Sequence, residues 1–257
     1  MREFFPLILV TSVWIFALAA CGGATLQPTA NATVITAQGD IKSKVDEYKA
    51  LFGQDNVGNP GSQASGFRTI TWDSVPDELA SPNNLPPDFF NDANAPRARG
   101  ANLSTPGTGV QASAKPGNPA NTAPRFGNLN PQYATLFKTF SPERLFSPVG
   151  SNAVDLTFLV PGTKTPAVTR GFGAVYTNVR IQKTDFEFFD SAGKSLGKFP
   201  VPLAKDGLSF LGIAFPTAIV ARVHIAYGTN ALGPNDASDV NVAVMDDFIY
   251  SEPQAVR

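Results

Sequence analysis

The sequence predicts an all-β protein, built as a jelly-roll-like antiparallel β-sandwich with one short N-terminal helix. Short segments in which apolar and polar residues alternate recur between residues 66 and 250, and turn residues separate them. Gly and Pro number 22 each, and Phe accounts for 20 residues. Charged residues make up 16% of the chain, below the roughly 25% usual for soluble proteins. Short strands, frequent turns and few charges are typical of a sandwich that works outside the cytoplasm.

The charge balance and the cysteine count exclude several kinds of partner and site. Lys and Arg number 20 against 21 Asp and Glu, and no basic stripe occurs, so no nucleic-acid partner is expected. The single cysteine, Cys21, cannot form an intrachain disulfide or a Cys-x-x-Cys metal or redox site.

Residues 1–20 are predicted to be a lipoprotein signal peptide. Arg2 precedes an apolar run that ends at Leu18-Ala19-Ala20-Cys21, and this ending resembles the bacterial lipobox, in which the cysteine is lipidated. The alternative is a transmembrane anchor, but the run of about 17 residues is short for crossing a bilayer. We therefore expect Cys21 to carry a lipid that attaches the protein to a membrane in the cell envelope.

The mature chain is expected to begin with a flexible tether over residues 21–38, because this stretch is rich in Gly, Ala, Thr and Asn. Residues 39–257 form the predicted sandwich domain. Its one convincing helix spans 40–52, where four apolar residues share a helical face, with Asp40 as the N-terminal cap and Gly53 at the C-terminal end. Those four residues are Ile41, Val45, Tyr48 and Phe52.

Strands are expected wherever the alternation is regular, and the longest loops fall between the first strand and residue 145. A hairpin is predicted over 102–114, and a mobile, nearly low-complexity loop over about 115–124. The predicted strands are 66–73, 154–160, 171–179, 184–190, 196–201, 208–215, 219–225 and 240–250.

The last predicted strand carries an acidic residue among its apolar ones. Asp246 shares the parity of the apolar residues, whereas Asp247 lies on the opposite, exposed parity. A buried carboxylate must be paired, hydrogen-bonded or bound to a metal. One hypothesis is a structural calcium ion held by Asp73, Asp246 and Asp247, where the first and last strands meet. The alternative, which we favour, is that Asp246 pairs with an arginine such as Arg68 or accepts backbone hydrogen bonds.

A binding site could form near the first strand, where aromatic rings and amides occur together. Trp72, Phe89 and Phe90 would stack on a ligand such as a glycan, and Asn83 and Asn84 would bond its hydroxyl groups. The alternative is that the aromatic residues pin a long loop to the core.

Catalysis is not expected. His224 is the only histidine and lies mid-strand, so it is interpreted as a surface or packing residue, and zinc would lack ligands. A carboxylate-dependent hydrolase would need two converging carboxyl groups. The residues considered for that role are Asp73, Glu143, Asp155, Asp246 and Asp247.

Six longer strings of the chain are distinctive. They are GFRTITWDSVPDELASPNNLPPDFFN (66–91), STPGTGVQASA (104–114), FKTFSPERLFSPVGSNAVDLTFLVPGT (137–163), RGFGAVYTNV (170–179), LSFLGIAF (208–215) and VMDDFIYSEP (244–253). These strings resemble a family of uncharacterised bacterial secreted β-sandwich proteins, some of which carry a C-terminal PEP-CTERM sorting tail. The resemblance extends from the helix near Val45 to Glu252 and implies fold and location only. This chain ends at Arg257 without a hydrophobic tail, so the lipid on Cys21 would be its anchor.

The sequence thus favours a lipid-anchored extracytoplasmic binding module, with a glycan or envelope component as its partner. A structural or adhesive cell-envelope protein is the alternative, and a carboxylate-dependent glycan hydrolase is the third hypothesis.

Overall fold

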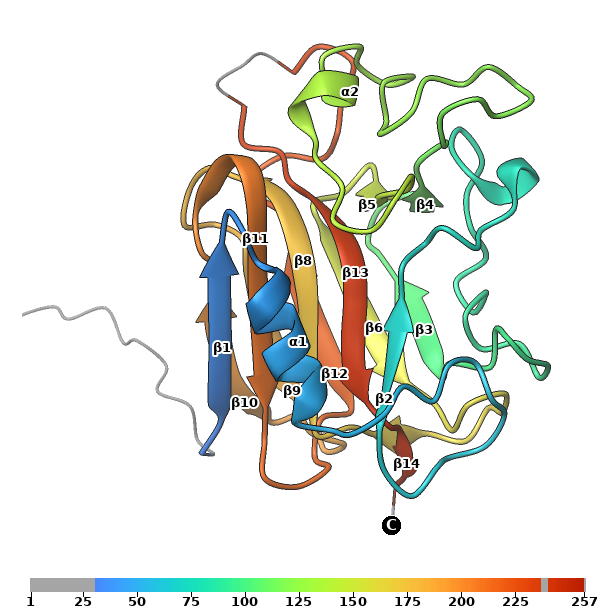
Figure 1. Cartoon of the computed structure of the whole chain (residues 1–257), viewed down its shortest axis with the longest axis vertical. Coiled ribbons are helices and arrows are strands. Elements are labelled where there is room, and N and C mark those ends of the chain that lie inside the picture. Colours follow the sequence, from blue (N-terminus) through green and yellow to red (C-terminus); the bar gives the residue numbers. More distant parts are fainter. Residues whose placement is uncertain (1–30, 237–239, 257) are drawn as a thin grey trace, which may run out of the picture.

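The computed structural model describes residues 31–236 and 240–256, which form a seven-stranded and a five-stranded antiparallel sheet packed as a β-sandwich (Figure 1). Their apolar inner faces form one core between the two layers. A two-stranded ribbon lies beside them. The strands are β1 Thr33–Gln38, β2 Phe67–Ile70, β3 Ala101–Ser104, β4 Gly109–Ala112, β5 Phe146–Val149, β6 Ala153–Phe158, β7 Ala167–Val168, β8 Gly171–Val179, β9 Asp185–Phe189, β10 Ser195–Pro200, β11 Ala204–Ala214, β12 Arg222–Ala226, β13 Val244–Ser251 and β14 Gln254–Ala255.

The strand order is that of a jelly roll. The seven-stranded sheet has the order β1-β11-β8-β13-β5-β4, with β2 also paired to β13, and the five-stranded sheet has the order β10-β9-β12-β6-β3. Across both sheets β5 pairs with β13, β6 with β12, β8 with β11 and β9 with β10. These pairs describe a ribbon of antiparallel strands that is folded over on itself, which defines the jelly roll and confirms the predicted fold class.

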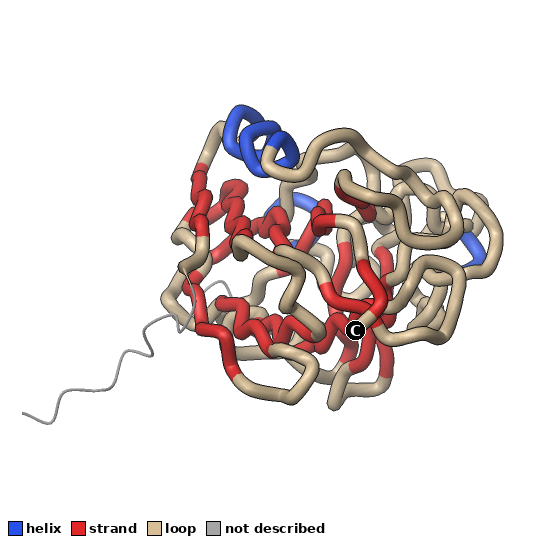
Figure 2. Tube along the Cα trace, turned by 90° about the horizontal axis from the view of Figure 1, so that it is seen from below, coloured by secondary structure: helices blue, strands red, loops and turns tan. Residues whose placement is uncertain are grey.

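The two sheets differ in how their outer faces are covered. Every residue of β8 is buried, because the core covers one face and the helix α1 (Lys42–Ala50) lies on the other. In β6, β9 and β12 buried residues alternate with half-buried ones, so only the inward side chains are covered. Figure 2 shows the helix outside one layer. The outer face of the five-stranded sheet is therefore the more accessible of the two.

The apolar face predicted for the helix is confirmed. Ile41, Val45, Tyr48 and Phe52 are all buried against the seven-stranded sheet. The Tyr48 hydroxyl donates to the Ile213 carbonyl at 2.9 Å, and its ring lies directly over Gly212, where an added Cβ would come within 2.5 Å of the ring. The predicted Asp40 cap is wrong, since Ile41 occupies that position with no side-chain cap.

The predicted tether is wrong for its second half. Residues 33–38 form β1, which pairs along its whole length with β11, while residues 21–30, including the predicted lipidation site Cys21, lie outside the described part of the chain. Only Ile35 of this strand is buried. Main-chain hydrogen bonds to β11 at the edge of the sheet hold this segment in place. Such bonds do not depend on the side chains, so the composition of the segment does not predict them.

The long loops are also more organised than their composition suggests. The predicted hairpin over 102–114 is wrong, because β3 pairs with β6 in one sheet and β4 with β5 in the other. Within 115–124, the Asn118 amide donates to the carbonyls of Lys115 and Thr122 and accepts from the Thr122 amide. In the described residues no helix has both the length and the apolar character needed to span a membrane.

Candidate functional site

A bulge in β13 brings the two predicted aspartates to the same place. Met245 is opposite Tyr176 of β8 and Phe248 is opposite Ala174, so Asp246 and Asp247 together face one residue. The prediction that Asp247 is exposed is therefore wrong: Asp246 is 0% exposed as a residue and Asp247 is only 3% exposed.

Both carboxylates converge on one loop. Ser141 Oγ lies 2.9 Å from Asp246 Oδ1 and 2.7 Å from Asp247 Oδ1, and the Phe140 amide donates to Asp246 Oδ2 at 2.5 Å. Burial, together with the neighbouring Asp247 charge, raises the pKa of Asp246 well above its ordinary 3.8. Burial also raises the pKa of Asp247, and Lys49 partly offsets this rise. Both shifts favour the protonated carboxyl at pH values where a free aspartate is ionised.

Asp73 joins this neighbourhood from the other side of the loop. It is half-buried, and its Oδ1 accepts from the Arg144 amide at 3.0 Å. Burial raises its pKa as well. The three predicted calcium ligands thus lie near one another, but within 31–236 and 240–256 no set of three or more acidic, His or Cys side chains is arranged to hold a metal ion. Calcium binding stays a prediction.

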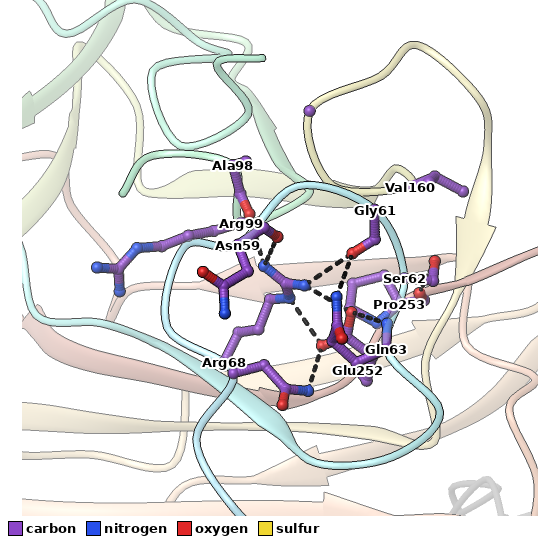
Figure 3. Close-up of polar contacts among 12 residues, drawn as sticks. Asn59, Gly61, Ser62, Gln63, Arg68, Ala98, Arg99, Val160, Glu252 and Pro253 are labelled. Carbon is purple, nitrogen blue, oxygen red and sulfur yellow. Dashed lines mark hydrogen bonds and ion pairs between the residues drawn. The ribbon is translucent and has the colours of Figure 1, made fainter. Parts of the chain in front are cut away.

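Arg68, the partner suggested for Asp246, instead pairs with Glu252 (Figure 3). Its Nε lies 2.8 Å from Glu252 Oε2 and its Nη2 lies 2.7 Å from Oε1, a bidentate pair with both side chains buried. Arg68 also donates to the carbonyls of Asn59, Gly61 and Ala98. This network joins the loop after α1 to the end of the chain.

The predicted stacking platform is not accessible. Trp72, Phe89 and Phe90 are buried, and Trp72 stacks on Phe146 at 4.1 Å between ring centroids. The Trp72 indole donates to the Asp246 carbonyl at 2.7 Å. The interpretation of these rings as ligand contacts is wrong, and they pin the long loop to the core.

The two predicted amides remain on the surface. Asn83 donates to the Glu78 carbonyl, and Asn84 donates to the Thr108 carbonyl while accepting from Gln111. Asn84 also lines a cavity of about 350 Å³ beside β3 and β4. Each thus makes hydrogen bonds within the protein and stays exposed, and a role for them in ligand binding stays a prediction.

The strongest candidate site is the outer face of the five-stranded sheet. Polar residues from neighbouring strands face each other there in two rows: Arg222 lies opposite Thr157 and Phe189, and His224 lies opposite Asp155 and Glu187. The edge strand β3 extends the rows with polar side chains opposite β6. We define the outer face by the residues Asn102, Ser104, Asp155, Thr157, Glu187, Phe189, Arg222 and His224.

Asp155 organises this face. Its Oδ1 accepts from Arg222 Nη1 and lies next to His224 Nδ1, each at 2.9 Å. Arg222 also places its guanidinium 3.7 Å from the centroid of the Phe189 ring. The side chains of Asp155 and Arg222 are each 33% exposed, and that of His224 is 35% exposed. When Nδ1 carries the hydrogen that bonds Asp155, Nε2 is left as the second polar atom of the ring.

This arrangement suits binding better than nucleophilic chemistry. A Ser-His-Asp mechanism places the imidazole between a hydroxyl and a carboxylate. Both residues opposite His224 are carboxylates instead. What the face offers is a row of fixed donors and acceptors beside a cation stacked on an aromatic ring.

Sequence reasoning considered His224 and Asp155 one at a time and missed Glu187, Phe189 and Arg222. The available signal was that the polar residues of three predicted strands share one parity. Comparisons of the whole chain with protein-family models, curated proteins and solved structures each found no match. The resemblance to secreted sandwich proteins therefore rests on the sequence strings alone.

Proposed function

We propose that this protein is a lipid-anchored extracytoplasmic binding module that recognises a glycan through the outer face, without catalysing a reaction. The observation that carries the proposal is the group of Asp155, Arg222 and His224 beside Phe189 on an accessible sheet. Sugars present many hydroxyl groups and weakly polarised C–H faces, so a prearranged set of donors, acceptors and one aromatic ring suits them.

The N-terminal sequence supports the location. The apolar run and the lipobox-like Leu18-Ala19-Ala20-Cys21 are what a lipidated envelope protein would need. In cells supplied with a labelled fatty acid, Cys21→Ser should abolish the label and release the chain from membranes. A variant that stays membrane-bound with Met1 intact would instead indicate a transmembrane anchor.

The rival hypotheses fit the contacts less well. A hydrolase needs two accessible carboxyl groups. Asp246 and Asp247 converge but are buried, while the accessible Asp155 is held in a salt bridge and Glu187 accepts a hydrogen bond from Ser195. A structural or adhesive protein would use the same face to bind a protein partner. The two hypotheses therefore differ in the class of molecule that binds to the outer face.

A glycan array probed with the purified full-length chain tests the proposal. We expect a defined set of glycans to bind wild type, and Arg222→Ala to reduce that binding at least tenfold, since the variant removes both the stacked cation and a bond to Asp155. Lys42→Ala, an exposed change on α1, is the control and should bind as wild type does. Absence of binding by wild type, or equal binding by Arg222→Ala, overturns the proposal.

A further inference from the structure

The cavity of about 350 Å³ beside β3 and β4 lies where the outer face ends. These are edge strands of the two sheets, so the cavity lies at the side of the sandwich where both sheets stop (Figure 1). Its volume is at the lower end of the range of about 300–1,000 Å³ typical of small-molecule sites, which suits one sugar unit better than a chain of them. We call this cavity the edge pocket and define it by Asn84, Leu85, Leu103, Ser104, Thr108 and Val110.

The edge pocket continues the outer face. Ser104 lies opposite Asp155, in the row of the outer face that also includes His224, and the same Ser104 lines the edge pocket. Ser104 is exposed, and its hydroxyl makes no hydrogen bond with a described residue. A ligand that lies along this row can therefore place one end in the edge pocket.

The floor of the edge pocket is apolar. Leu85, Leu103 and Val110 line it, each at most 3% exposed and each part of the core between the two sheets. None of the described residues that line the pocket carries a charge. An apolar group gains free energy by leaving water for such a floor, whereas a charged group would lose its hydration without gaining a counter-ion. The group that fits is therefore neutral and partly apolar.

The rim of the edge pocket is polar. Asn84 Nδ2 donates to the Thr108 carbonyl at 3.0 Å, and Asn84 Oδ1 accepts from Gln111 Nε2 at 3.1 Å. These bonds hold the amide in place and use one of its two hydrogens and one lone pair of its oxygen, so a donor and an acceptor remain. Gly109 permits this position, because an added Cβ would come within 2.3 Å of Asn84 Nδ2. Asn84 and the Ser104 hydroxyl can thus bond both an N–H and a C=O group.

We propose that the edge pocket binds the acetamido group of an N-acetylated sugar, at one end of the glycan that lies on the outer face. The acetamido methyl contacts Leu103 and Val110, which a sugar hydroxyl at the same position cannot do. The acetamido N–H and C=O bond Ser104 and Asn84 at the rim. This inference rests on the proposed function and makes its ligand more specific.

Two trisaccharides with the same linkage test the inference. N,N′,N″-triacetylchitotriose and cellotriose differ only in whether each ring carries an acetamido group or a hydroxyl group at its second carbon. In isothermal titration calorimetry with the full-length chain, we expect triacetylchitotriose to bind about tenfold more tightly, because a methyl group leaves water and hydrogen bonds form at the rim.

Variants of Thr108, which is exposed at the rim, locate the site. Thr108→Trp fills the pocket and should remove the preference for the acetylated trimer, whereas Thr108→Val keeps the size of the side chain and should retain that preference. Thr165→Trp places the same ring at an exposed position outside the pocket and should also retain it. If Thr108→Trp lowers the urea midpoint, Ser104→Leu narrows the pocket from the exposed end of β3 and should reduce the preference instead.

Equal binding of the two trimers by wild type overturns this inference, and so does a preference that both Thr108→Trp and Ser104→Leu retain. Binding of neither trimer overturns it as well. The glycan array with Arg222→Ala decides the proposed function separately, since Arg222 does not line the edge pocket. Glycans without N-acetyl groups that bind wild type and are lost in Arg222→Ala would uphold glycan binding by the outer face and overturn only the role of the edge pocket.

Discussion

Two buried clusters of acidic side chains lie near the two ends of β13, and their surroundings stabilise them in different ways. Glu252, directly after β13, pairs with Arg68 of β2, whereas Asp246 and Asp247 within β13 face each other. In the first cluster opposite charges cancel and backbone carbonyls complete the arginine's hydrogen bonds. In the second, like charges are close together and Ser141 and the Phe140 amide are their donors.

The comparison shows two ways in which a fold accommodates a buried acid. A neighbouring cation can neutralise the carboxylate, or the surroundings can raise the pKa of the carboxyl and favour its neutral form. Glu252 lies against the Arg68 guanidinium, whereas burial and the neighbouring Asp247 charge raise the pKa of Asp246 and so favour its neutral form. We therefore expect the two clusters to respond differently to substitution.

The largest effect should come from breaking the opposite-charge pair. Glu252→Ala leaves Arg68 buried without a counter-ion and should lower the free energy of unfolding by about 3–5 kcal/mol, measured by urea denaturation at pH 7. Lys42→Ala, which breaks the exposed Lys42–Asp46 pair on α1, is the control and should cost no more than about 0.5 kcal/mol. Similar losses for the two variants would mean that the buried pair adds nothing specific.

A smaller loss is expected from the acid pair. Asp246→Ala removes the acceptor of the Phe140 amide and should cost about 1–3 kcal/mol, because an unpaired buried donor is expensive, but it leaves no counter-charge behind. Asp246→Asn keeps an acceptor for that amide and should lose less. The same denaturation series tests this ranking. A loss for Asp246→Ala equal to that of Glu252→Ala would show that Asp246 is in fact paired with a cation.

The acid pair should also make the stability of the protein depend on pH. A carboxyl whose pKa is raised on folding holds its proton in the folded state at pH values where the unfolded chain has lost it. The Asp246 contribution is therefore absent above its raised pKa, grows as the pH falls through that pKa and is complete near 3.8. Asp73 adds a contribution of the same sign, and Lys49 opposes that of Asp247.

We expect wild type to gain stability relative to Asp246→Asn as the pH is lowered from 8 towards about 4.5, measured as the difference in urea midpoint. A parallel pH profile for wild type and Asp246→Asn would rule out a raised pKa for Asp246.

The smallest expected effect is on the melting temperature when calcium is added or removed. It tests whether the acid pair is neutralised by protonation or by a bound calcium ion. If the pair holds a proton, a chelator should leave the melting temperature of wild type unchanged, and added calcium chloride should not raise it. A rise with calcium concentration that is lost in Asp246→Asn would establish the calcium hypothesis, because an ion that binds only the folded state stabilises it by mass action.

Several features of the fold could be predicted because they depend on local pattern. The strands 171–179 and 208–215 and the buried face of α1 follow from apolar periodicity and turn residues, which short-range geometry fixes. Trp72 and Phe89 show the limit of such arguments. An aromatic residue in a loop looks the same in the sequence whether it faces solvent or the core, and only the packed structure places these two inside.

By itself, the sequence determined the sandwich class, the positions of most strands and the helix that covers one sheet, because each depends on a periodic pattern within a few residues. Only the tertiary structure decided the pairing of β1 with β11, the bulge at Asp246–Asp247, the choice of Glu252 as the partner of Arg68, and the assembly of the outer face. The physical reason is that each of these depends on strand register and on contacts between segments tens of residues apart. Register is set by what lies on the neighbouring strand, and a shift of one residue moves every side chain to the opposite face.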